Sequence, residues 1–246
     1  KGDMSINIQN QTPRLVFPFG VSVQRGLVED FTAVGQYGYN SAVSTTFATI
    51  WGGTGLYVYP TTATTAVATS SNTASDDGGT VLVTGLNASF NQISETITIG
   101  GSASTNSFIR VFSARMLTAN TGDANVGNIT ITVDSKTVAY IPATYGSSLS
   151  ANYCIPRNYK GYILSAYAGV SKQKELTAKI MTKQISNGNV WNTVGFQTTF
   201  AVPVYQQFTV PIPINEKTDI EMRALTDATT SVSGGFTLAL EKVVQS

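Results

Sequence analysis

Residues 80–99, TVLVTGLNASFNQISETITI, decide the fold class of this 246-residue chain. They contain two short runs rich in Val, Ile and Thr, joined by a connection of Gly, Asn and Ser residues. In each run apolar and polar side chains alternate, which places one face of an extended strand against a core and the other face in water. The stretch therefore predicts a pair of antiparallel strands.

Runs of the same kind recur along the chain, separated by turn signals rich in Gly, Asn and Asp. The tightest pair lies in residues 130–141, where Asp134-Ser135-Lys136 separates two alternating runs and predicts a short-loop hairpin. Residues 177–183, TAKIMTK, also fit a short helix, but the Asn187-Gly188 turn signal after them favours a strand. Many short strands with no long helical pattern between them predict an all-β fold. We expect an antiparallel β-sandwich, for which a jelly roll is one topology.

Residues 1–60 differ from the remainder of the chain, because they hold few alternating runs and gather aromatic side chains from Phe17 to Tyr59. A segment this rich in aromatics is not disordered by composition, yet it lacks the periodicity of an independent domain. We therefore predict an extended, irregular N-terminal arm over residues 1–60 and a β-sandwich domain over residues 61–246. The arm packs either on the edge of the chain's own core or on a neighbouring subunit.

Charge is scarce in this chain, since 12% of its residues are Asp, Glu, Lys or Arg and the net charge is +1. Thr, Ser, Asn and Gly fill most polar positions, so we expect a surface of neutral hydroxyls and amides. No Lys/Arg run interleaves with aromatics and no run of about 20 apolar residues occurs, so neither nucleic acid nor a membrane is an expected partner. Cys154 is the single cysteine, which excludes an intramolecular disulfide and favours a small buried side chain.

The chain contains no histidine. Nucleophilic mechanisms of the Ser/His/Asp and Cys/His types need an imidazole, and zinc sites built on histidines or several thiolates are excluded by the same composition. Two carboxylates of the glycosidase kind remain, but no spacing among the Asp and Glu residues selects a pair. Residues 76–79, DDGG, lack calcium-loop spacing and are expected to form a turn. We predict no catalytic residue, no metal site and no cofactor, and hence a protein that is not an enzyme.

Short motifs follow one another between residues 25 and 133, namely Arg25–Asp30 (RGLVED), Gly38–Asn40 (GYN), Ile50–Gly53 (IWGG), Gly85–Asn87 (GLN), Ile93–Ile97 (ISETI) and Asn128–Ile131 (NITI). In this order they resemble virion structural proteins of tailed bacteriophages, particularly marine cyanophage-like ones. The motifs consist of turn and strand residues and contain no reactive constellation. Beyond residue 133 the resemblance is limited to a general β-rich character.

The resemblance implies a non-enzymatic component of a phage virion, such as a capsid decoration, vertex or knob-type protein attached through its N-terminal arm. The implied partners are other virion proteins, either the major capsid protein or vertex and tail proteins. The implied assembly is a homo-oligomer, and analogy with other virion β proteins suggests a trimer. Aromatic side chains suit such docking because they bury much area at small entropic cost. The predicted partner-binding residues are Phe17, Phe19, Arg25, Phe31, Tyr37, Tyr39 and Trp51.

Two other classes of function stay open. One is a tail-associated receptor- or carbohydrate-binding module, in which Tyr145, Tyr153 and Trp191 would stack on sugars. The other is a glycan-cleaving enzyme that uses an unidentified carboxylate pair. Binding to host cells or glycans separates the first from a purely structural protein, and release of reducing ends separates the second.

Overall fold

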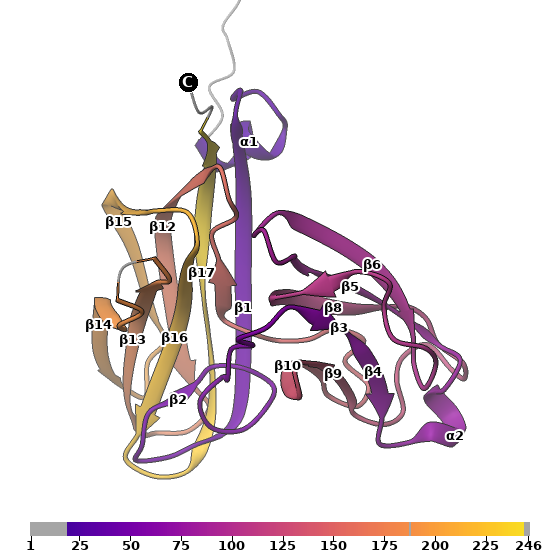
Figure 1. The fold of residues 1–246 in the computed structure, drawn as a ribbon. Helices are drawn as coiled ribbons and strands as arrows, with labels where there is room; N and C mark the ends of the chain where they lie inside the picture. The colour runs from indigo at the N-terminus through magenta and orange to yellow at the C-terminus, as the bar shows by residue number, and fades with distance from the viewer. Residues whose placement is uncertain (1–18, 187, 244–246) are drawn as a thin grey trace, which may run out of the picture.

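The computed structural model describes residues 19–186 and 188–243. The described chain is built almost entirely of antiparallel strands, with two short helices, α1 (Phe19–Gln24) and α2 (Thr73–Asp76). The prediction of an all-β fold is therefore confirmed. The strands form two lobes that lie side by side (Figure 1). No helix in the described ranges has the length and apolar character needed to cross a membrane.

The first lobe is a sandwich of two antiparallel sheets. One sheet has the strand order β1-β17-β12-β15, and the other has the order β11-β16-β13-β14, with β2 pairing with β16 on the same side as β11. After β2 the chain leaves for the second lobe and returns at β11. The bounds are β1 (Phe31–Val43), β2 (Ala48–Thr49), β11 (Asn152–Cys154), β12 (Tyr159–Val170), β13 (Glu175–Gln184), β14 (Asn192–Phe200), β15 (Val204–Ile214), β16 (Thr218–Thr226) and β17 (Thr230–Lys242).

The core of the sandwich is filled from both sheets. Ile163, Leu176, Ile220 and Phe236 are fully buried, and they come from β12, β13, β16 and β17. Burying each such side chain stabilises the fold by about 1.5–3 kcal/mol relative to leaving it exposed. Residues 177–183, which also fitted a helix, lie in β13 between β14 and β16, as the turn signal indicated.

The second lobe has a core of its own, in which Phe108, Ile129 and Ile131 are fully buried. Residues 80–99 supply the hairpin of β5 and β6, paired from Thr80 with Thr98 to Leu86 with Gln92. The second predicted hairpin is also present, since β9 and β10 are joined at Asp134 and Ser135, whose φ angles are 50° and 56°. Positive φ at both central residues suits the right-handed twist of a hairpin.

Eight short strands build this second lobe: β3 (Thr64–Thr65), β4 (Val67–Ser70), β5 (Thr80–Leu86), β6 (Gln92–Thr98), β7 (Ser107–Phe108), β8 (Arg110–Thr118), β9 (Ile129–Val133) and β10 (Lys136–Ile141). Their pairing orders are β6-β5-β8, β10-β9-β4 and β3-β7. The lobe is thus an insertion between β2 and β11 of the sandwich.

The strand pairing corrects the boundary expected at residue 60. Residues 31–43 form β1, which pairs with β17 from Phe31 and Glu241 to Val43 and Thr230, so an irregular arm is the wrong description for them. The sequence of β1 does not show the alternation of apolar and polar residues expected of a strand. One reason is Gly38, where the backbone approaches a neighbouring segment too closely for a side chain to fit. A Cβ atom on Gly38 would lie 2.0 Å from the carbonyl oxygen of Ile50. The range 61–246, expected to be one sandwich, likewise contains the second lobe with its separate core.

Candidate functional site

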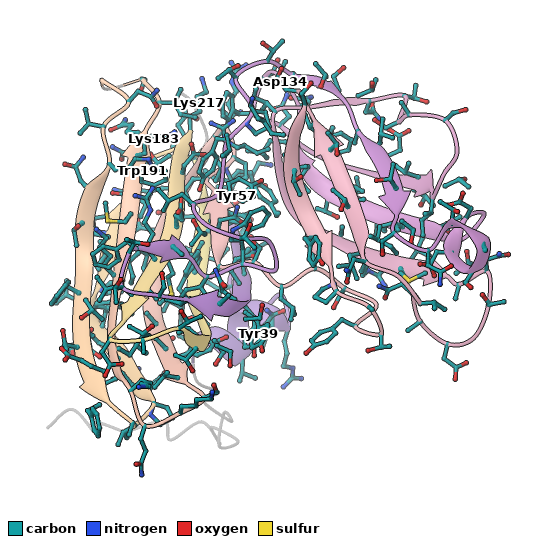
Figure 2. All side chains as sticks on the ribbon, turned by 90° about the horizontal axis from the view of Figure 1, so that it is seen from below. Tyr39, Tyr57, Asp134, Lys183, Trp191 and Lys217 are labelled. Carbon is teal, nitrogen blue, oxygen red and sulfur yellow. The ribbon has the colours of Figure 1, made fainter. Side chains whose placement is uncertain are left out.

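A cluster of charged and aromatic side chains lies where the two lobes meet, around the labelled Tyr57, Lys183 and Trp191 of Figure 2. It includes Asp219 and Glu221, which lie two residues apart on β16 and are fully buried. Their even-numbered neighbours on β16 point into the sandwich core. Because side chains alternate along a strand, both carboxylates lie on the opposite face of β16, towards the second lobe.

Arg110, at the start of β8 in the second lobe, binds Asp219 at two points. Its Nε donates to Oδ1 at 2.7 Å and its Nη2 donates to Oδ2 at 3.0 Å. The remaining nitrogen, Nη1, donates to the carbonyl oxygens of Ile109 and Pro60. Lys183 of β13 adds a second cation, with Nζ 3.5 Å from Asp219 Oδ2. Two cations therefore compensate one buried carboxylate across the junction of the lobes.

Glu221 is held in a similar way by residues of its own lobe. Its Oε1 accepts hydrogen bonds from Arg223 Nε at 2.9 Å and from the hydroxyl of Thr49. Thr49 lies in β2, directly before the chain enters the second lobe. The other carboxylate oxygen, Oε2, has no hydrogen-bond partner among the described residues.

Aromatic rings extend this cluster. Trp51, Tyr57, Tyr59 and Trp191 contact one another in sequence, with ring centroids 5.1, 4.7 and 5.7 Å apart. The guanidinium of Arg110 lies 5.0 Å from the centre of the Tyr59 ring. Burial raises the pKa of both the Tyr57 and Tyr59 hydroxyls well above the usual tyrosine range, so both rings stay neutral. Neutral rings attract cations by about 0.5–2 kcal/mol each, which adds to the ion pairs.

The side chains at this junction hold the two lobes together, and they bind one another. Internal partners occupy every nitrogen of the Arg110 guanidinium and both oxygens of Asp219. A cleft of about 510 Å³ opens beside it and is lined by residues that include Tyr59, Phe90 and Asn189. In the described part of the chain, no three His, Cys, Asp or Glu side chains gather as a metal site requires.

Asp76, from the acidic turn in the sequence, has a structural task instead. Its carboxylate accepts hydrogen bonds from the Ser70 hydroxyl and from the amides of Val126 and Gly127 at 2.5, 2.7 and 2.8 Å. It therefore fixes the loop before β9 to α2, which contains Asp76, and to the end of β4.

The predicted partner-binding residues are not brought together. Phe17 lies outside the described residues. Phe19 is exposed on α1 and packs edge-to-face on Phe31, with ring centroids 5.7 Å apart. Arg25 is exposed in the turn after α1. Further along β1, Tyr39 is half-buried, and exposed Tyr37 stacks on Tyr167.

Trp51 is buried, in contrast to its predicted role as a surface anchor. Its indole nitrogen donates to the Gly55 carbonyl oxygen, and its ring packs on Tyr57 inside the second lobe. The residue therefore belongs to the core and is closed to a partner.

The three candidate sugar-stacking residues differ in how far they are exposed to solvent. Tyr153 is buried, with its ring centroid 4.2 Å from that of Phe112. Trp191 is half-buried, and Lys183 and Arg223 lie 5.0 and 4.7 Å from its ring centre. Tyr145 alone is more than half exposed, at 53%. No shared stacking platform arises from these three side chains.

Sequence reasoning missed a group of exposed apolar side chains on β14, β15 and the turn between them, which we call the uncharged segment (Asn192–Ile214). Between Lys183 and Glu216 the chain has no Asp, Glu, Lys or Arg, and this signal was available in the sequence. Large apolar side chains on the uncharged segment are 61–82% exposed. They are Phe196, Phe200, Val202, Tyr205 and Val210. Large exposed apolar side chains that gather on one segment are typical of interaction sites.

Comparison with known proteins gives little further direction. No family model matches the chain, and no curated protein matches it. One solved structure, titled "Structure of infectious bursal disease virus Gt strain", is similar to 91% of this chain and 78% of that chain, with 12% sequence identity and a TM-score of 0.23. This neighbour is a viral protein, but a likeness at that TM-score carries no argument about fold or function.

Proposed function

We propose that this chain is a non-enzymatic structural component of a bacteriophage particle. The observation that carries the proposal is the strand order of the sandwich. The sheet β1-β17-β12-β15 faces the sheet β2-β16-β13-β14, with β11 continuing the edge that β2 begins. From β12 to β17 the chain alternates between the two sheets, except that β13 and β14 follow one another in the same sheet. This strand order supports the jelly-roll part of the proposal, an architecture that recurs in viral capsid and lectin domains.

The motifs between residues 25 and 133 support the same assignment, because they resemble virion structural proteins of tailed phages. The contacts at the junction of the lobes support the same proposal, because they stabilise the arrangement of the two lobes. A shell component must keep its shape without further folding help, and the buried Arg110–Asp219 pair together with the stacked rings ties the inserted lobe to the jelly roll. Internal pairing of the charged groups favours such a mechanical role over chemistry.

We further propose that the chain attaches to the particle through its N-terminal segment. Because residues 31–43 form β1, this segment consists of the residues before β1. In the described part of that segment, Phe19, Val21 and Leu27 are 47%, 43% and 60% exposed. These side chains form an apolar surface on and after α1, which suits docking on another virion protein. A capsid decoration, vertex or knob-type position follows from this attachment, with the virion as the location.

The test is association with phage particles. Tagged protein is mixed with particles of the phage that encodes it, prepared without the protein, and co-sedimentation is measured. We expect the full chain to bind. Deletion of residues 1–30, which leaves β1 intact, and the double variant Phe19→Ser and Leu27→Ser should both reduce binding at least tenfold, since about 2 kcal/mol or more is typical of a buried aromatic anchor.

Val126→Ser is the matched control, because Val126 is 47% exposed in the second lobe, away from α1. Absence of the protein from purified particles, or binding that is unchanged by the deletion, would contradict the proposal. Because a jelly roll also occurs in lectins, the same preparation is applied to host cells and glycans. Tight binding there without particle binding would favour the receptor-binding class instead.

A further inference from the structure

β14 is an edge strand, and no described residue range supplies a strand that pairs with its outer side. The sheet order β11-β16-β13-β14 leaves it last, and it lies on the side of the sandwich away from the second lobe (Figure 1). In such a strand, alternate residues direct their backbone N–H and C=O groups outward, where they form a template for pairing with another strand.

Two other edge strands, β15 and β6, carry protection of a kind that β14 lacks, although the pairing of β14 with β13 is irregular at Val194. β15, the edge of the facing sheet, contains Pro211 and Pro213, which have no N–H to offer. At the edge strand β6, Glu95 accepts hydrogen bonds from the amides of Thr105 and Asn106 at 2.6 and 2.8 Å, so a loop covers that region. The sequence of β14, NTVGFQTTF, contains neither a proline nor a charged residue.

The charge pattern selects the kind of partner. No charged side chain occurs between Lys183 and Glu216, so β14 itself brings no like charges to a contact with a second copy; the nearest charges are Lys179 and Glu175, one strand further in on β13. Phe196 and Phe200 are four residues apart, so they lie on the same face of β14. They are 61% and 62% exposed. Around a twofold axis each pair would cover the pair of the other copy.

Backbone geometry also favours a second copy. The outward N–H and C=O groups of a strand are self-complementary when two identical strands run antiparallel about a twofold axis. We propose that two copies of this chain pair through the outer edges of β14, so that their four-strand paths β11-β16-β13-β14 join into one continuous sheet. This inference rests on the proposed function in one respect, namely that the chain is an assembling protein.

The first experiment measures mass against concentration by light scattering for the full chain. The proposal requires a dimer, or a higher even-numbered assembly. Phe200→Lys places like charges across the twofold axis and should weaken the dimer by about 30-fold or more, which corresponds to loss of one strong anchor. Val126→Lys, which adds the same charge to an exposed valine of the second lobe, should leave it unchanged. Circular dichroism verifies that both variants are folded.

The second experiment maps the pairing without weakening it. Single cysteines are introduced along β14 at Thr193, Phe196 and Thr198, and copies are oxidised with copper phenanthroline. The natural Cys154 is fully buried and does not interfere. Opposed strand positions lie about 4.5–5.5 Å apart, within reach of a disulfide, and a residue meets its own copy only at the twofold axis. We expect the yield of cross-linked dimer to peak at one position.

A trimer, a monomer at all concentrations, or cross-linking of β14 cysteines no faster than of a Val126→Cys control would overturn the proposal. These outcomes are distinct from those of the particle test. A β14-linked dimer that binds no particle supports this inference while the proposed function fails. A monomer that binds particles keeps the proposed function and removes the inference.

Discussion

Arg110 and Asp219 join the two lobes through a two-point ion pair in which Nε and Nη2 lie 2.7 and 3.0 Å from the two carboxylate oxygens. Both side chains are almost completely buried. The pair connects the first residue of β8 to the second residue of β16. Its two parallel hydrogen bonds restrict the relative orientation of the two strands, and hence that of the inserted lobe and the sandwich.

Breaking this pair should be strongly destabilising. Arg110→Ala leaves a buried carboxylate with Lys183 alone, and we expect the free energy of unfolding to fall by about 3–5 kcal/mol. Arg110→Lys should recover little, because an ammonium group cannot donate along two parallel directions. Urea unfolding measures both changes. Glu175→Ala, an exposed acid at the start of β13, is the control and should cost less than about 0.5 kcal/mol. Equal losses in the control and in Arg110→Ala would show that the pair contributes nothing specific.

The glycines of β1 give a second prediction with a control on the same strand. A Cβ atom on Gly38 would lie 2.0 Å from the Ile50 carbonyl oxygen and 2.6 Å from the Ala151 amide nitrogen. Backbone must therefore move, and Gly38→Ala should cost about 3 kcal/mol or more, or prevent folding. Gly35→Ala meets nothing within 4 Å and should change stability by less than about 1 kcal/mol. Thermal melts of the two variants test this prediction. Similar melting temperatures would contradict the close approach of the Gly38 backbone to Ile50 and Ala151.

The same glycine explains what could be predicted from the sequence. Hairpins with clean alternation, such as residues 80–99, are local and could be placed correctly. β1 could not, because glycine and asparagine at the buried positions 38 and 40 remove the apolar signal that alternation needs. The inserted lobe was missed for a related reason. Its strands alternate as those of the sandwich do, and periodicity does not tell which strands share a core.

The candidate site depended even more on tertiary structure. Arg110 and Asp219 are distant in sequence, and nothing near either residue indicates the other. Trp51 was expected on a surface because aromatic composition does not distinguish a core ring from an anchor. By contrast, the charge-free stretch between Lys183 and Glu216 was visible from the beginning. Its significance emerged only when β14 proved to be an edge.

Two carboxylates that accept backbone hydrogen bonds should make the stability of the fold sensitive to acid. Burial alone would raise the pKa of Asp76, but the Ser70 hydroxyl and the Val126 and Gly127 amides outweigh burial and lower it. The pKa of Glu95 is lowered in the same way, because amide hydrogen bonds from its neighbouring loop outweigh burial. Each folded-state pKa thus lies below its unfolded value, so the unfolded chain binds more protons in acid. The stabilisation is complete above the ordinary values of 3.8 and 4.5 and is lost as pH falls through the lowered ones.

We therefore expect the melting temperature to fall steadily below about pH 5. Asp76→Asn should be less stable than the parent at pH 7, because its amide nitrogen would replace one carboxylate oxygen and face the backbone N–H of Val126 or Gly127. The difference between the two proteins should shrink as the pH decreases, since protonation removes the advantage of Asp76. Melting curves between pH 7 and pH 2 measure this. A constant difference over the whole range would show that the carboxylate charge has no part in the effect.

The thiol of Cys154 offers a direct report on the junction. Cys154 lies on β11 opposite Asp219 of β16, and it is fully buried. Burial raises the pKa of this thiol well above its ordinary value, so the reactive thiolate is scarce in the folded protein. We expect maleimide to label the parent protein only as fast as the whole chain unfolds. Because Asp219 is held by Arg110, the Arg110→Ala variant should react faster, and by the factor that its loss of stability sets, about tenfold per 1.4 kcal/mol. Rapid labelling of the folded parent protein would mean that β11 and β16 separate without global unfolding, and that the lobes are not clamped as the structure indicates.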